Sequence, residues 1–118
     1  MRFKFLLWIL GKKLIKKART SVDFKKKVSE KNCTVQIKTA DSKIGRYYTF
    51  NNGGVTSTGG VTANPAAVMV WKDAATAFKV LASGDDAKGM QAFQDGSLKL
   101  EGDAETALWF TEVAKQLK

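Results

Sequence analysis

Residues 90–108 have the sequence MQAFQDGSLKLEGDAETAL, and this stretch indicates the fold more strongly than any other part of the chain. A short helix that carries Met90 and Phe93 is expected to end at Gly96, since glycine commonly follows the last turn of a helix. Apolar and polar residues then alternate over 97–100, which is typical of a strand. Gly102-Asp103 begins a further helix. The stretch therefore predicts a helix, a strand and a helix joined by two glycine-containing turns.

The chain before this stretch supplies the remaining elements. Alternation of apolar and polar residues over 33–38 predicts a half-buried strand, and the apolar run 66–71 predicts a strand buried on both faces. Residues 51–54, NNGG, supply the positive φ angles of a tight hairpin. The expected elements are a helical N-terminal stretch, a second around 24–28, strands 33–38, 45–50, 55–58 and 66–71, helices 73–81 and 85–95, strand 97–100, and a C-terminal helix from 103. This order predicts an α+β fold in which helices cover a five-stranded, mostly antiparallel sheet.

Five positions of the opening stretch match a family signature. Gly96, Leu98, Leu100, Gly102 and Asp103 fit the form Gly-x-Leu-x-Leu/Ile-x-Gly-Asp, and the chain over residues 33–117 resembles the sterol carrier protein 2 (SCP2) family. The resemblance implies a hydrophobic tunnel between sheet and helices that holds a fatty acyl chain, a phospholipid, an isoprenoid or a sterol-like lipid. It also implies a protein without cofactor or catalytic residues. The ligand-binding residues that it suggests are Phe78, Leu81, Met90, Phe93, Trp109, Phe110 and Val113.

Positive charge is concentrated at the start of the chain. Residues 1–31 hold 11 Lys and Arg against 2 acidic residues, whereas residues 32–118 hold 9 of each sign. This asymmetry predicts a basic, amphipathic helical arm over 1–31 and an SCP2-like lipid-binding domain over 32–118.

Three readings of the N-terminal arm are open. Its apolar arc could pack on the protein's own sheet, it could dock on an anionic membrane, or it could bind nucleic acid. Nucleic acid is the least favoured, because a phosphate-binding arm has no need of the apolar run 5–10. That run is too short to span a bilayer, but beside basic residues it suits a membrane interface. The residues expected to bind membrane are Phe5, Leu6, Trp8, Lys12, Lys13, Lys16, Lys17 and Arg19.

The composition argues against common enzyme chemistry. The chain has no histidine and a single cysteine, which excludes His-activated nucleophiles and imidazole or multi-thiolate metal sites. Cys33 belongs to the apolar face of its strand, so inert burial is expected, and a lone cysteine favours a reducing compartment. The acidic residues between 85 and 105 are expected to cap helices and occupy turns.

These patterns predict a non-enzymatic lipid carrier, cytoplasmic and peripheral at a membrane. Two alternatives differ in the partner. One is an accessory module that presents a lipid to partner enzymes, and the other is a basic-arm module with a solid core that binds nucleic acid or protein.

Overall fold

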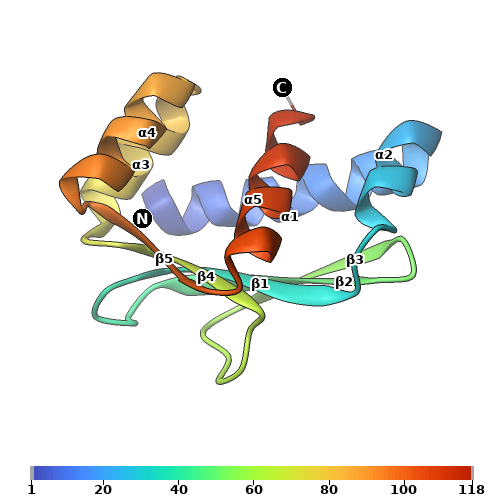
Figure 1. The fold of residues 1–118 in the computed structure, drawn as a ribbon, viewed down its shortest axis with the longest axis horizontal. Coiled ribbons are helices and arrows are strands. Elements are labelled where there is room, and N and C mark those ends of the chain that lie inside the picture. The colour runs from blue at the N-terminus through green and yellow to red at the C-terminus, as the bar shows by residue number, and fades with distance from the viewer. Residues whose placement is uncertain (1, 118) are drawn as a thin grey trace.

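The computed structural model describes residues 2–117 and has two layers. All the helices lie on one side of a single sheet (Figure 1). The elements in chain order are α1 (Arg2–Thr20), α2 (Val22–Val28), β1 (Cys33–Thr39), β2 (Gly45–Asn51), β3 (Gly54–Gly59), β4 (Ala67–Trp71), α3 (Ala74–Ser83), α4 (Asp86–Asp95), β5 (Leu98–Gly102) and α5 (Ala104–Lys115). The α+β fold expected from the sequence is confirmed.

The five strands form one sheet in the order β3-β2-β1-β4-β5. β1 and β4 pair in parallel at the centre, and every other neighbouring pair is antiparallel. Val35 and Ile37 of β1 and Tyr48 and Phe50 of β2 are buried in the core, as their alternation predicts. Gln36, on the other face of β1, is buried too and accepts the Thr62 backbone N–H, so the expectation of a half-buried strand was wrong at this position. β4 is buried on both faces: Ala67 and Trp71 are buried on one face, and Val68 and Val70 are buried on the other.

Short polar caps fix where the helices begin and end. The carboxylates of Asp73, Asp85 and Asp103 accept backbone N–H bonds in the first turns of α3, α4 and α5. Gly84 and Gly96 end α3 and α4 in the left-handed conformation that glycine adopts without strain. The acidic residues at these positions therefore cap helices, in agreement with the sequence.

α1 packs its apolar arc on the sheet. Phe3, Leu7, Leu14 and Ala18 are buried, and the helix contacts β2, β3, α2 and α3. The hydroxyl of Tyr48 donates a 2.7 Å hydrogen bond to the backbone carbonyl of Leu7. Of the open readings of the arm, packing on the protein's own sheet is the arrangement found for this arc.

Aromatic side chains join α5 to the centre of the sheet. Phe110 stacks on Tyr48 with ring centroids 5.9 Å apart, and Trp109 meets Phe50 edge to face at 5.0 Å. Phe50 and Phe110 are also in edge contact at 6.0 Å. Aromatic pairs in these geometries stabilise a core beyond their buried area. These aromatic contacts thus fix the inner arc of α5 to β2.

Candidate functional site

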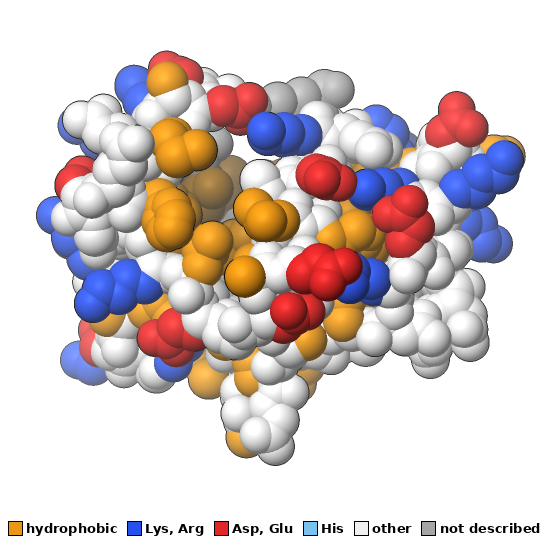
Figure 2. Space-filling view, viewed as in Figure 1, with side chains coloured by type: hydrophobic (Ala, Val, Ile, Leu, Met, Phe, Trp, Pro, Cys, Tyr) orange, Lys and Arg blue, Asp and Glu red, His pale blue; other side chains and the backbone are white. Residues whose placement is uncertain are grey.

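The helix layer leaves an apolar cleft at its surface. α3 and α4 pack on each other and on the β4–β5 edge, while α5 packs on β1, β4, β5 and α2. Apolar side chains gather in a hollow between the α3–α4 pair and α5 (Figure 2). Four large apolar residues of these helices are 38–61% exposed, namely Leu81, Met90, Phe93 and Leu108. We use the name apolar cleft for this hollow together with the four exposed side chains of the helices that border it.

The seven residues suggested as ligand-binding lie in three different environments. Leu81, Met90 and Phe93 are exposed on the α3–α4 side of the apolar cleft. Phe78 is half-buried and lines a separate hollow beside α1. The remaining three, Trp109, Phe110 and Val113, are buried in the core beneath α5.

Leu108 is an apolar surface residue that the sequence analysis missed. It is the most exposed of the four cleft residues and faces solvent from α5. On a helix it shares an arc with Glu112 and Lys115, at i+4 and i+7. The sequence could have indicated Leu108, because a large apolar residue on an otherwise charged arc of a helix is unusual.

An ion pair spans the two sides of the cleft at one end. The carboxylate of Asp86, in the first turn of α4, lies 4.0 Å from the ammonium of Lys115 in the last turn of α5. Both side chains are more than half exposed, so the pair contributes little to stability. It marks the place where α4 and α5 come together.

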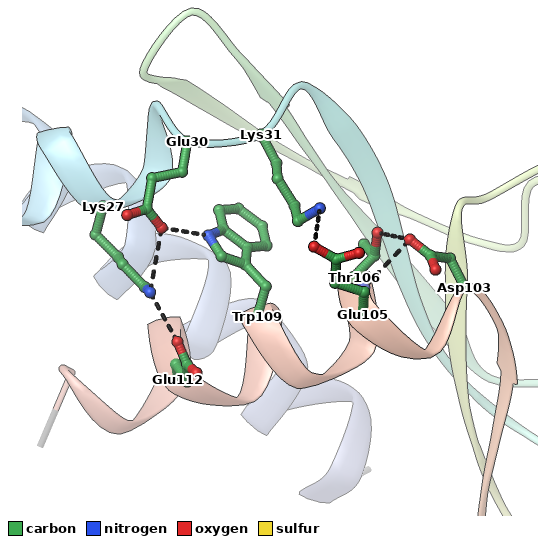
Figure 3. A network of polar contacts seen from close by, with 8 residues as sticks. All are labelled: Lys27, Glu30, Lys31, Asp103, Glu105, Thr106, Trp109 and Glu112. Carbon is green, nitrogen blue, oxygen red and sulfur yellow. Dashed lines mark hydrogen bonds and ion pairs between the residues drawn. The ribbon is translucent and has the colours of Figure 1, made fainter.

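The other side of α5 is fastened to α2 by a polar network (Figure 3). Lys27 contacts the carboxylates of Glu112 at 2.7 Å and Glu30 at 3.2 Å, and the indole N–H of Trp109 donates to Glu30 at 3.1 Å. The hydrogen bond with Lys27 lowers the pKa of Glu112, and the same bond raises the pKa of Lys27. α5 is therefore anchored toward α2, while Lys115 at its end reaches Asp86 of α4.

A second hollow lies between the start of α1 and α3. It has a volume of about 450 Å³ and is lined by Arg2, Phe3, Ala74, Ala75, Phe78 and Lys79. The guanidinium of Arg2 lies over the Phe78 ring, 5.8 Å from its centroid. We call this the Arg2–Lys79 hollow.

The outer surface of α1 is both aromatic and basic. Phe5 and Trp8 are 58% and 44% exposed and stack with ring centroids 5.9 Å apart. The ammonium of Lys12 lies 5.2 Å from the Trp8 ring centroid. We define the outer surface of α1 by its exposed residues Phe5, Trp8, Lys12, Lys13, Lys16 and Arg19.

Two residues expected to bind membrane lie elsewhere. Leu6 is half-buried. Lys17 is half-buried too, donates to the Gln116 carbonyl, and lies over the Phe24 ring at 5.6 Å. Within residues 2–117, no helix combines the length and apolarity that a bilayer crossing requires.

The described residues offer little polar chemistry. Across residues 2–117, no three His, Cys, Asp or Glu side chains come together as a group that could hold a metal ion. Cys33 is half-buried, and burial raises the pKa of its thiol, which lowers the thiolate fraction at neutral pH. The side chains in the apolar cleft provide contact surface.

This architecture defines a class: a small α+β domain whose helices cover one face of a mixed sheet and present an apolar cleft. The sequence profile of the SCP-2 sterol transfer family matches residues 12–115. The chain belongs to this family, whose members bind or transfer lipids.

Solved structures share the fold at low sequence identity. The sterol carrier protein domain 2 of Helicoverpa armigera superposes with a TM-score of 0.69 at 15% identity, covering 98% of this chain and 89% of that one. A structure titled UbiJ-SCP2 ubiquinone synthesis protein gives 0.67 at 15% identity, with 95% and 87% coverage. A crystal structure of sterol carrier protein 2 gives 0.65 at 17% identity, with 92% and 90% coverage. No curated protein matches the sequence.

Proposed function

We propose that this protein is a non-enzymatic lipid carrier that holds the apolar part of its ligand in the apolar cleft. The observation that carries the proposal is the exposure of Leu81, Met90, Phe93 and Leu108 on the helices that border one hollow. Contiguous apolar surface of this kind usually marks a binding site. Membership of the SCP-2 sterol transfer family supports a lipid as the occupant.

A lipid would bind in the apolar cleft because binding removes the apolar surface of both from water. Each Å² of apolar area covered by a ligand contributes roughly 25 cal/mol to binding. Trp109, Phe110 and Val113, buried in the core beneath α5, would hold that helix rigid, while Phe93 and Met90 would provide the contact. Methionine suits such a surface because its flexible thioether adapts to different ligand shapes.

We further propose that the protein docks on anionic membranes through the outer surface of α1. Phe5 and Trp8 project from the helix face opposite Phe3 and Leu7, which stay buried. Docking would therefore not require α1 to leave the sheet. Aromatic rings suit the headgroup boundary, and each nearby cation contributes about 1 kcal/mol against an anionic leaflet.

Ligand binding is tested by native mass spectrometry of the purified full chain, followed by organic extraction. A co-purifying lipid is expected with the wild type and should be lost in Met90→Asp/Phe93→Asp. Both positions are about half exposed, so the variant should fold. Val22→Asp, at an apolar residue 74% exposed on α2, is the matched control and should retain the lipid. A wild type without lipid that also fails to take up added oleate would refute the carrier proposal.

Membrane docking is tested by flotation with phosphatidylcholine vesicles, with and without phosphatidylglycerol. Phe5→Ser/Trp8→Ser should reduce binding to the anionic vesicles, and Val22→Ser/Val61→Ser should not. Point changes are preferred to a deletion of the N-terminal arm, because the deletion would also remove Phe3, Leu7 and Leu14 from the core. Equal flotation of both variants would refute docking through this surface.

An accessory role beside partner enzymes is a second candidate. It is supported by the likeness to the structure titled ubiquinone synthesis protein. It predicts a stable protein complex that survives Phe5→Ser/Trp8→Ser. A carrier working alone would instead exchange lipid between vesicles without any partner.

The nucleic-acid alternative assumes a solid core and predicts salt-sensitive DNA or RNA binding. An apolar cleft gives such a module no advantage, so this alternative ranks below the other two. A gel-shift titration with duplex DNA and single-stranded RNA distinguishes it from them.

A further inference from the structure

The Arg2–Lys79 hollow combines an apolar lining with cations. Phe3 is fully buried and Phe78 half-buried, and the two alanines of the first α3 turn complete the apolar part. Its volume of about 450 Å³ falls within the range of small-molecule sites in proteins, roughly 300–1,000 Å³. Among the described residues of its lining, Arg2 and Lys79 are the charged ones.

Neither cation forms an ion pair with any described acidic side chain. Asp73 is the acidic residue nearest in sequence to the lining, and its carboxylate accepts the Thr76 backbone N–H at 2.7 Å as the α3 cap. The Arg2 guanidinium lies over the Phe78 ring, 5.8 Å from its centroid, in a cation–π arrangement. Two uncompensated cations beside an apolar lining favour an amphipathic anion over a neutral ligand.

We infer that the Arg2–Lys79 hollow binds the anionic headgroup, a carboxylate, of a single-chain lipid. This inference rests on the proposed carrier function and adds the orientation of the ligand. Arg2 supplies a planar fork that matches a carboxylate, and Lys79 supplies a second donor. Phe78 and Leu81 are three residues apart on α3, hence neighbours on its surface, and they link the hollow to the apolar cleft. The chain runs from Arg2 along α3 toward Met90 and Phe93.

The test compares two probes that differ only in the headgroup: cis-parinaric acid and the corresponding alcohol. Fluorescence titration of the full chain measures both affinities in the wild type and in Arg2→Gln/Lys79→Gln. The control, Lys43→Gln/Lys99→Gln, removes the same net charge from exposed positions outside the hollow. We expect the hollow variant to bind the acid about tenfold more weakly, the value of one lost charge-assisted hydrogen bond. Its affinity for the alcohol should match that of the wild type.

The results separate this inference from the carrier proposal. If the hollow variant binds the acid as well as the wild type does, or loses affinity for acid and alcohol equally, the headgroup site is refuted while lipid binding stands. If the wild type binds neither probe, the carrier proposal fails, and the headgroup site fails with it. Displacement of the bound acid at a lower concentration of oleate than of oleyl alcohol would add support.

Discussion

Gly11 is a residue at which α1 packs tightly against the sheet. A β-carbon built there would lie 2.7 Å from Ser57 Cβ and 3.2 Å from Tyr48 Cε1, and it would also overlap the Ser57 hydroxyl. Glycine inside a helix normally costs up to about 1 kcal/mol relative to alanine. Here the missing side chain allows α1 to sit directly on β3.

Gly11→Ala should therefore destabilise the protein even though alanine favours helix. Overpacking typically costs about 1–3 kcal/mol, which exceeds the gain in helix propensity. The control is Gly89→Ala in α4, where no described atom beyond the neighbouring residues and the backbone of the same helix lies within 4 Å of the added carbon, and it should raise stability. Urea denaturation measures the free energy of unfolding of both variants. A rise in stability with Gly11→Ala would show that α1 lies farther from β3 than described.

Tyr48 offers a second test at a single residue. Its hydroxyl is buried against the Leu7 carbonyl, so Tyr48→Phe should cost about 1 kcal/mol at pH 7. Burial also raises the pKa of this phenol above its ordinary value of about 10. The unfolded chain ionises first, so the stabilisation is complete below about pH 10 and is lost as the pH rises further.

The wild type should accordingly lose more stability between pH 8 and 11 than Tyr48→Phe does. Urea midpoints of both proteins at each pH measure the difference between the two stability losses. The lysines titrate in both proteins alike, so their contribution cancels in this difference. Equal losses in the two proteins would contradict the burial of the hydroxyl.

At the scale of elements, α1 carries two different surfaces. Phe3 faces the core and Phe5 faces outward, two residues apart. Phe3→Ala should cost about 3–5 kcal/mol by leaving a cavity. Phe5→Ala should change the free energy of unfolding by less than about 1 kcal/mol. Denaturation of both variants, with flotation of Phe5→Ala, tests whether folding and docking depend on separate faces.

The anchoring of α5 to α2 can be loosened without touching the core. Glu112→Gln removes the charge from the 2.7 Å contact with Lys27 and should increase amide hydrogen exchange in α2 and α5. Glu101→Gln, at an exposed β5 residue, is the control with the same charge change. Unchanged exchange in α2 and α5 would show that the aromatic contacts alone hold these helices together.

For the whole molecule, ligand binding should raise stability through mass action. Free ligand at 100 times its dissociation constant adds about 2.7 kcal/mol to the free energy of unfolding. Oleate should therefore raise the thermal midpoint of the wild type, and the rise should be absent in Met90→Asp/Phe93→Asp. A wild-type midpoint that does not respond to oleate would count against the carrier proposal.

The distribution of the net charge of +9 has a similar global consequence. Binding to vesicles that contain phosphatidylglycerol should weaken as salt rises from 50 to 500 mM, since the Debye length falls several-fold. The residual binding at high salt reports the apolar contribution of Phe5 and Trp8. Salt-independent flotation would contradict an electrostatic role for the α1 lysines.

The sequence by itself determined the order and type of the elements. The glycine turns at Gly96 and Gly102, the Asp caps and the period-two alternation of β1 act over a few residues, so their effect is readable from local pattern. The same locality made the family signature at residues 96–103 recognisable.

Only the tertiary structure decided which apolar residues are surface and which are core. Phe93 and Phe110 are both aromatic residues on helices that the sequence predicts, yet one is half exposed and the other buried, because α4 packs on the edge strand β5 and α5 packs across β1, β4 and β5. The docking of α1 depended in the same way on its fit to β3 at Gly11. Residues 90–108 therefore identify the fold, whereas the cleft they help to form depends on how five helices share one face of the sheet.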